Sequence, residues 1–189
     1  MNIDADSIIS EAEELLDVGE FDRCKKLLEP LVEKSNPKAI RLFYSIFDND
    51  VSDEERERIY VEGMFKAADL GDLEALYIVG SFYDLGEHIQ EDKAKASSIF
   101  KEAADRGHAH SQWIHACELL WGLGSYAQNV EAGLEYLEKA ISAKSGEACI
   151  TKARLYHEGE FDFPKNSEKV QELCELAVEY DETVFVPYT

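Results

Sequence analysis

Apolar residues recur three or four positions apart along most of the chain, which is the spacing of one buried helix face. In the first part, such a run at 5–18 ends at Gly19, and a second run follows the phrase GEFD and closes at the Asn-Pro pair 36–37. Glycine and Asn-Pro are typical boundaries of helices. The pattern therefore predicts two antiparallel helices over 5–34, joined by a short turn.

The same order of apolar run, turn and second run repeats along the chain. The phrase KAADLG at 66–71 returns as EAADRG at 102–107, and one helix, a glycine-containing turn and a second helix are predicted between them. Equivalent residues align at steps of 36 or 37: Leu31, Ala67, Ala103, Ala140 and Ala177. A constant period over five units predicts a helical solenoid, in which each unit packs on its neighbours.

Two parts of the chain resemble known helical repeats. LLDVGEFDRCKKLLEPLVEKSNPKA resembles a tetratricopeptide repeat in its GEFD turn and its NP pair. The later units are similar to the Sel-1-like repeat, a longer relative, and the best match is carried by Ala75, Val79, Gly80, Tyr83, Gly86, Asp92, Lys95, Ala96, Phe100, Ala103, Ala104 and Gly107. The resemblance reaches to about residue 180 and is strongest over 64–180.

This resemblance implies an all-α fold, a right-handed α-solenoid of about ten helices in five antiparallel pairs. We expect one solenoid domain over 1–189. Its parts are a tetratricopeptide-like pair at 5–36, Sel-1-like units at 37–72, 73–108, 109–145 and 146–180, and a tail or cap at 181–189.

The chain is strongly acidic, with 40 acidic and 19 basic side chains and a net charge of -21. This charge repels nucleic acid and anionic membranes and attracts basic proteins. The sequence has neither a signal-peptide pattern nor an apolar run of spanning length, so we expect a cytoplasmic protein. The four cysteines are far apart in the sequence, which favours buried free thiols over disulfides.

Catalytic and metal motifs are sparse. We find no GxSxG, Walker-type, GxGxxG or HExxH pattern, and we therefore expect no enzyme activity and no cofactor. His108, His110, His115 and Cys117 lie within ten residues, but His110 and His115 are five apart, which is not the i, i+3 or i+4 spacing of ligands on one helix face. We expect the first two histidines in an inter-repeat turn, His115 packed between helices, and no metal.

The segment DNDVSDEERERI, from residue 48 to 59, superficially suggests a calcium loop. That loop requires glycine at its sixth position and glutamate at its twelfth, where this chain has Asp53 and Ile59. The simpler interpretation is an acidic turn followed by a helix that Ser52 or Asp53 caps.

The resemblance to tetratricopeptide-like solenoids implies that the first helix of each pair lines a concave face. Residues offset from the core positions by helical periodicity then point into the groove. The predicted partner-binding residues are Arg41, Tyr77, Ser81, Asp84, His110, Trp113, Cys117, Leu120, Trp121, Arg154, His157 and Glu158.

Both tryptophans of the chain fall in this set, on one helix. Trp113 and Trp121 suit either the core between repeats or an interface hot spot, and the sequence leaves both alternatives open. Their unit, 108–145, has four acidic and two basic residues, whereas the flanking units are more acidic. A weakly charged aromatic centre with an acidic rim is typical of an interface core, and it is equally typical of a middle repeat that is buried by its neighbours.

The tail DETVFVPYT carries Val184, Phe185, Val186 and Tyr188. It either folds over the end of the last helix pair, which a solenoid must cap, or serves as a strand-like ligand for another protein. The cost of leaving an apolar helix face bare favours the cap.

The sequence thus predicts a non-enzymatic protein-interaction module, a monomer or weak dimer that binds a basic protein partner in its groove. It binds neither nucleic acid nor membranes. Size and charge suit a stoichiometric inhibitor, such as an immunity protein that blocks a basic toxin. The alternative is a regulatory adaptor or scaffold in signalling or secretion.

Overall fold

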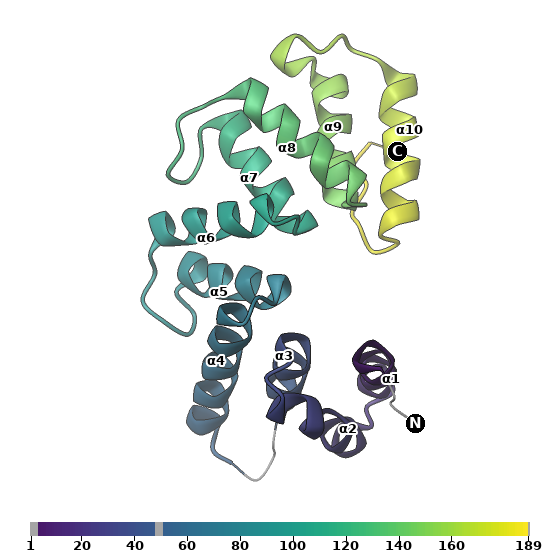
Figure 1. Ribbon diagram of the computed structural model, residues 1–189. Helices are drawn as coiled ribbons and strands as arrows, with labels where there is room; N and C mark the ends of the chain where they lie inside the picture. Colours follow the sequence, from purple (N-terminus) through teal and green to yellow (C-terminus); the bar gives the residue numbers. More distant parts are fainter. Residues whose placement is uncertain (1–3, 48–50, 189) are drawn as a thin grey trace. The chain divides into compact units, whose positions relative to one another are not determined.

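The computed structural model describes residues 4–47 and 51–188, which form ten α-helices and one short 3-10 turn, with no strand in this part (Figure 1). The helices are α1 Ala5–Asp17, α2 Phe21–Glu33, α3 Pro37–Ser45, α4 Asp53–Asp69, α5 Leu73–Leu85, α6 Lys93–Asp105, α7 Ala109–Trp121, α8 Val130–Ser142, α9 Gly146–Glu158 and α10 Ser167–Tyr180. The turn η1 spans Glu160–Asp162. The predicted fold class, helices in five successive pairs, is confirmed.

The chain divides into two compact units, Met1–Glu91 and Asp92–Thr189. The division falls between α5 and α6, inside the unit that matches the repeat pattern best. The single continuous domain over 1–189 stays a prediction.

Polar side chains begin nearly every helix at the predicted position. In α3 and α5, for example, the side chains of Asn36 and Asp72 accept the backbone N–H of Ala39 and Ala75. Ser52 caps α4 in the same way, which confirms the predicted capped helix, while residues 48–50 of the acidic turn lie outside the described residues. A side chain that satisfies an end N–H stabilises a helix by about 1 kcal/mol. The repeat boundaries are therefore fixed locally, before any packing.

The core of the first unit lies between α1, α2 and α3. Ile9, Ala12, Cys24, Leu28 and Leu42 are buried in one cluster there. Small residues set the helix spacing: a Cβ added to Gly63 of α4 would lie 2.3 Å from Cβ of Tyr44. Such contacts explain why small residues recur at the helix crossings.

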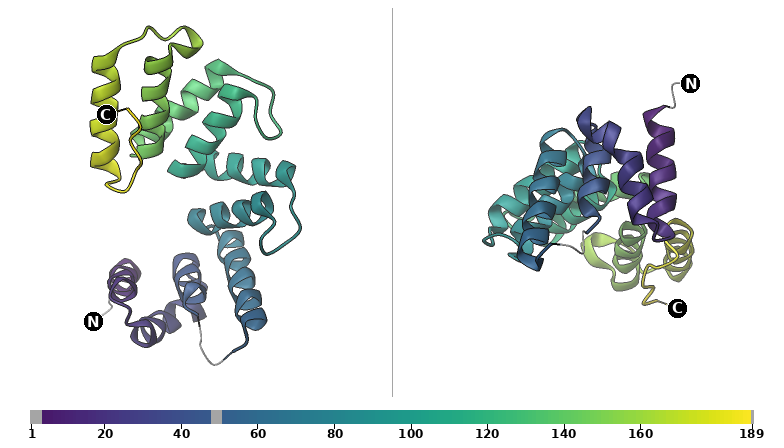
Figure 2. Two further views of the ribbon diagram at one scale, coloured as in Figure 1. Left: turned by 180° about the vertical axis from the view of Figure 1, so that it is seen from behind. Right: turned by 90° about the horizontal axis from the view of Figure 1, so that it is seen from below.

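In the second unit, α7, α8 and α9 share a core cluster that contains Ala116, Leu120, Leu137 and Leu155. Gly133 of α8 approaches α7 closely, since a Cβ there would lie 2.8 Å from Cγ of Leu120. The last pair, α9 and α10, lies side by side, as Figure 2 shows, and buries a smaller cluster around Ala153 and Cys174.

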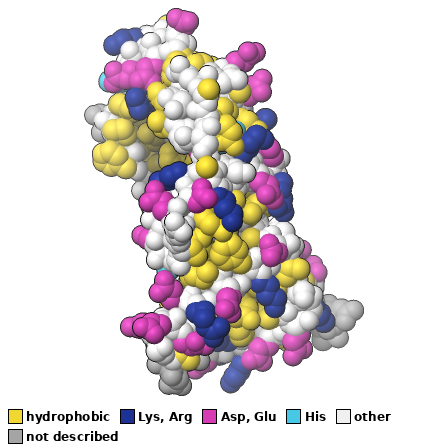
Figure 3. All heavy atoms as spheres, turned by 90° about the vertical axis from the view of Figure 1, so that its left-hand side faces the viewer, with side chains coloured by type: hydrophobic (Ala, Val, Ile, Leu, Met, Phe, Trp, Pro, Cys, Tyr) yellow, Lys and Arg dark blue, Asp and Glu magenta, His cyan; other side chains and the backbone are white. Residues whose placement is uncertain are grey.

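None of the described helices is long and apolar enough to cross a membrane. On the face drawn in Figure 3, acidic and basic side chains alternate with separate apolar patches. The charge on this face is therefore interspersed with the apolar surface.

Candidate partner-binding surface

The first helices of two successive pairs, α7 and α9, present side chains that are bonded to one another in the second unit. Nε1 of Trp113 donates to Oγ1 of Thr151 at 2.8 Å, and Nε1 of Trp121 donates to Oε2 of Glu160 at 3.2 Å. Each indole N–H is thus satisfied by the following pair. We call the surface formed by α7, α9 and the turn η1 the α7–α9 face.

Trp121 lies at the centre of the most aromatic part of this face. The guanidinium carbon of Arg154 is 4.9 Å from the indole centroid, and the ring of Phe161 is 6.0 Å away. Nη2 of Arg154 also donates to Oε1 of Glu160 at 2.9 Å. These four side chains form a cluster, the Trp121 cluster, that combines a cation, an anion and two aromatic rings.

The turn η1 contains Glu160 and Phe161 of this cluster, and its backbone is unusual at Phe161 and at the following Asp162. Phe161 and Asp162 have φ angles of 52° and 63°, in the left-handed region that side-chain-bearing residues rarely adopt. Such strain concentrates at functional sites, where the surrounding structure maintains it. Here it directs Phe161 against Trp121.

At the other end of the face, His110 and Cys117 have protein partners. Nδ1 of His110 lies 3.1 Å from Oε1 of Glu147, and its ring is 5.0 Å from that of Trp113. Burial raises the pKa of the Cys117 thiol to about 12, although its hydrogen bond with Thr151 lowers it somewhat. Cys117 is therefore a neutral thiol at neutral pH and no nucleophile.

The C-terminal edge of the face meets the tail. His157 and Glu158 are exposed, and the ring of Tyr188 stacks on that of His157 at 4.7 Å with an interplanar angle of 30°. Val186 and Tyr188 also pack against the core of the last pair. This packing is the one expected of a cap.

The predicted residues of the first unit lie apart from this cluster. Arg41 donates from Nε to Oδ1 of Asp72 at 2.9 Å, and Asp72 also caps α5, so Arg41 holds α3 to the start of α5. Ser81 donates to the carbonyl of Tyr77 at 3.2 Å, and both residues are half-buried, as is Asp84.

The prediction for Leu120 was wrong. Its side chain is fully buried, with a relative exposure of 0%, and packs in the shared core opposite Gly133 of α8. The neighbouring Trp121 is displaced by 100° around the helix axis and is half-buried. Both tryptophans pack against the edge of the core cluster and keep part of their surface exposed, so each contributes to the core, and a role in an interface stays a prediction.

Sequence reasoning missed Glu160 and Phe161. The phrase GEFD occurs twice, at 19–22 and at 159–162, but only the first copy was interpreted. In the first copy Phe21 begins α2, whereas in the second the phrase forms η1. The repeated phrase was an available signal of a turn at 159–162, but it did not indicate the left-handed conformation, which the first copy lacks at Phe21.

The histidines have structural roles. His108 caps α7, where its Nδ1 accepts the N–H of Ser111, and His110 lies in the first turn of that helix. His115 is packed between helices as predicted, 2% exposed, with its ring 4.8 Å and 4.7 Å from those of Tyr126 and Tyr136. Within residues 4–47 and 51–188, no three His, Cys, Asp or Glu side chains are grouped to hold a metal ion.

His115 belongs to a buried polar network in the second unit. Its Nδ1 lies 3.1 Å from Oε2 of Glu118, and the other oxygen of Glu118 accepts a hydrogen bond from Ser97 of α6. Glu118 is 8% exposed. This carboxylate joins α6 to α7 through buried polar contacts.

Comparison with known proteins identifies the fold. A Sel1 repeat protein from Oxalobacter formigenes matches with a TM-score of 0.74 at 15% identity, over 94% of this chain and 74% of that one. The protective antigen c5321 of uropathogenic Escherichia coli, which has an SLR fold, matches with a TM-score of 0.65 at 19% identity, over 84% of this chain and 34% of that one.

A third match is the immunity protein Pa5087 from Pseudomonas aeruginosa, with a TM-score of 0.53 at 14% identity, over 97% of this chain and 85% of that one. No protein-family model matches the chain, and no curated protein matches its sequence. At these identities the likeness is one of fold. The chain has the Sel1-like repeat fold, as its sequence pattern predicted.

Proposed function

We propose that the protein is a non-enzymatic binding module that holds a basic partner protein on the α7–α9 face. The observation that carries this proposal is the Trp121 cluster, in which Arg154 lies over the ring of Trp121 and pairs with Glu160. Tryptophan and arginine dominate the hot spots of protein interfaces, because both give large contact area and directed polar bonds.

The cluster is suited to exchange its internal cation for one from a partner. Arg154 is exposed, with its side chain 47% accessible, so its ion pair with Glu160 is screened by water and weak. A partner's arginine or lysine that replaces it gains the ring face of Trp121 and the carboxylate of Glu160 together. The net charge of -21 attracts such a partner and accelerates the encounter.

Of the two uses of such a module, we favour stoichiometric inhibition. The chain is small and acidic, and one protein of similar fold is an immunity protein. We place it in the cytoplasm, where its four free cysteines stay reduced. The alternative is an adaptor or scaffold in signalling or secretion. It would bind its partner on the same α7–α9 face but would leave the partner's activity unchanged.

Variants on the first helices of two different pairs test the proposal. We expect Trp121→Ala to weaken binding of the partner captured from native cells by about 30-fold, or about 2 kcal/mol, because it removes the ring that a cation would cover. Tyr77→Ala, on α5 of the first unit, should weaken it much less. Titration calorimetry measures both, with circular dichroism to show that each variant is folded.

An acidic or nucleic-acid ligand in place of a basic protein would contradict the proposal, as would equal affinity of wild type and Trp121→Ala. An activity assay of the captured partner then separates inhibitor from scaffold. Loss of the partner's activity at one equivalent supports inhibition, and unchanged activity supports the scaffold.

A further inference from the structure

In the second unit, the second helix of a pair offers a surface that the first helix of the next pair covers. On α6 this surface includes Ser97, which meets Glu118 of α7. On α8, 37 residues later, it includes Leu134, which packs in the same cluster as Leu155 of α9. Leu155 is itself 37 residues after Glu118, so the two interfaces are equivalent.

The third equivalent surface is on α10, which among the described residues is followed by the tail 181–188 and not by a further helix. Gln171, 37 residues after Leu134, lines a groove of about 1040 Å³ between α9, α10 and the tail. We call it the terminal groove; its apolar lining comes from Tyr156, Val170, Cys174, Val178, Val186 and Tyr188. Its volume is at the upper end of the range of ligand pockets, and it lies where a sixth pair would dock.

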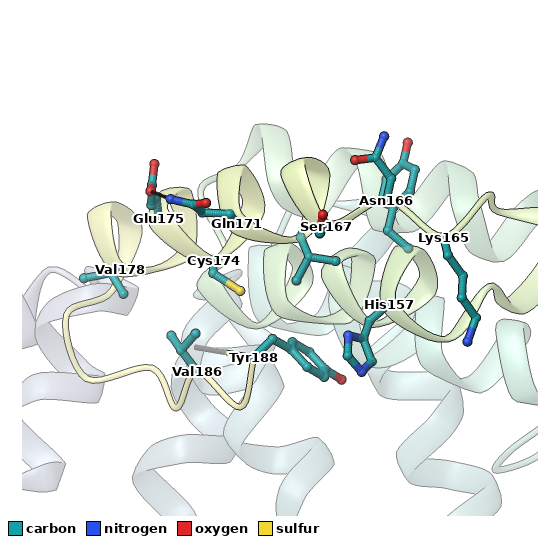
Figure 4. A pocket seen from close by; sticks show the side chains of 12 residues that line it. His157, Lys165, Asn166, Ser167, Gln171, Cys174, Glu175, Val178, Val186 and Tyr188 are labelled. Atoms are coloured by element: carbon teal, nitrogen blue, oxygen red, sulfur yellow. Dashed lines mark hydrogen bonds between the residues drawn. The ribbon is translucent and has the colours of Figure 1, made fainter.

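The tail covers the terminal groove only partly. Figure 4 shows Val186 and Tyr188 on the tail below Cys174, with Tyr188 beside His157. Phe185, which precedes Val186, is 80% exposed. The N–H of Asp181 donates to the carbonyl of Ala177, and the other hydrogen bonds of the described part of the tail lie within the turn 181–184. A segment with few buried contacts opens readily, and the groove stays open beside it.

We propose that the terminal groove binds an amphipathic helix of a partner protein, seated where the first helix of a sixth pair would lie. The preceding pair shows the fit, because α9 fills the equivalent surface of α7 and α8 with Ala148 and Leu155. Helices bind apolar grooves through residues spaced i, i+3, i+4 and i+7. The bound helix therefore presents one small side chain and one large apolar side chain toward Gln171 and Cys174, as α9 does on the equivalent surface with Ala148 and Leu155.

The charge of this region specifies the other face of that helix. Residues 146–189 contain ten acidic and four basic side chains, so a basic helix is attracted. A second copy of this chain carries the same excess of negative charge and is repelled. The occupant is thus a basic amphipathic helix from a different protein. None of the residues that line the terminal groove belongs to the Trp121 cluster.

A synthetic helix tests the groove in the full-length chain. The probe is a fluorescein-labelled peptide of residues 145–161 with Glu147→Lys, Glu158→Lys and Glu160→Lys, which keeps the apolar face of α9 and makes the rest basic. We expect saturable one-to-one binding by fluorescence anisotropy at physiological salt. The control peptide carries Leu155→Asn in addition and should bind at least fivefold more weakly.

Variants of the protein locate the binding. Val178→Asn, in the groove, should weaken it at least fivefold, whereas Leu123→Asn should not change it; the two residues are 47% and 52% exposed, so both variants should fold. Gln171→Leu introduces the residue type of the equivalent position in the preceding pair, Leu134, and should tighten binding of the peptide at least fivefold. These neutral changes leave the charge, and therefore nonspecific attraction of the basic peptide, unaltered.

Three results would overturn the proposal. They are equal binding of the two peptides, equal binding by Val178→Asn and Leu123→Asn, or dimerisation of Gln171→Leu without peptide binding, as measured by light scattering. The last result would assign the groove to a second copy of the chain. The neutral variant Trp121→Ala should leave this assay unchanged, so its failure and that of the proposed function are distinguishable.

Discussion

The first helices α5 and α7 hold equivalent positions in the repeat, yet their outward side chains are used differently. Tyr77 and Ser81 of α5 correspond to Trp113 and Cys117 of α7, each 36 residues later. Ser81 bonds its own helix at the carbonyl of Tyr77, whereas its equivalent Cys117 has a hydrogen bond with Thr151 of the next pair. The repeat fixes where these side chains lie, and the residue types decide whether they form a site.

The same contrast holds for arginine. Arg41 in the first unit is largely buried, with 17% of its side chain accessible, and it pairs with a helix-capping aspartate. Arg154 in the second unit is exposed and lies over an aromatic ring. An arginine committed to a helix cap stabilises the fold, whereas one held by an exposed pair is available for exchange. We therefore place the proposed binding site in the second unit.

The largest effect on stability is expected at the buried carboxylate of the second unit. Glu118→Ala leaves Ser97 and His115 without their acceptor and should lower the free energy of unfolding by about 2–3 kcal/mol. Both tryptophans lie in this unit, so their fluorescence in a urea titration reports it directly. Glu118→Gln, which keeps an acceptor oxygen, should cost less; equal losses would contradict the role given to the hydrogen bonds.

A smaller effect is expected in the first unit. Arg41→Ala removes the bond to Asp72 but leaves Asp72 as the cap of α5, so we expect a loss of about 1 kcal/mol. Circular dichroism should detect the shift while the tryptophan fluorescence transition moves less. Partner affinity should stay the same, and a tenfold loss of affinity would place Arg41 in the binding site.

The smallest effect concerns Cys117. Because its pKa is raised to about 12, only about one thiol in ten thousand is ionised at pH 8, four pH units below. Its reaction with a thiol reagent, followed by mass spectrometry of the labelled peptide, should be at least a hundredfold slower in the native chain than in urea. The native rate should rise tenfold per pH unit; a rate already maximal at pH 8 would show an activated thiolate.

The period and the turn residues were sufficient to predict the helices, because each boundary is fixed locally by a cap such as Asp72 or by a glycine such as Gly86. The site was harder. A repeat alignment sets the phase of a helix only to within about one residue, which is why Leu120 was placed on the face and proved to be core. A left-handed turn at Phe161, which has a side chain, is set by tertiary packing and carries no periodic signal.

The sequence pattern also did not predict the division of the chain after Glu91. The unit at 73–108 matches the repeat more closely than any other, so nothing in its sequence distinguishes the junction between α5 and α6 from the other turns. The regular spacing of apolar residues predicts the helices within each pair. The extent of packing between pairs depends on the identity of individual side chains, which a repeat pattern does not distinguish.

Hydrogen–deuterium exchange of the chain with and without its captured partner tests the central claim most directly. The account predicts slower exchange in the partner complex over 109–121 and 146–162, which contain α7, α9 and η1, and unchanged exchange over 37–45 in α3. Protection that is confined to α3 and α5, with none in α7 or α9, would contradict it.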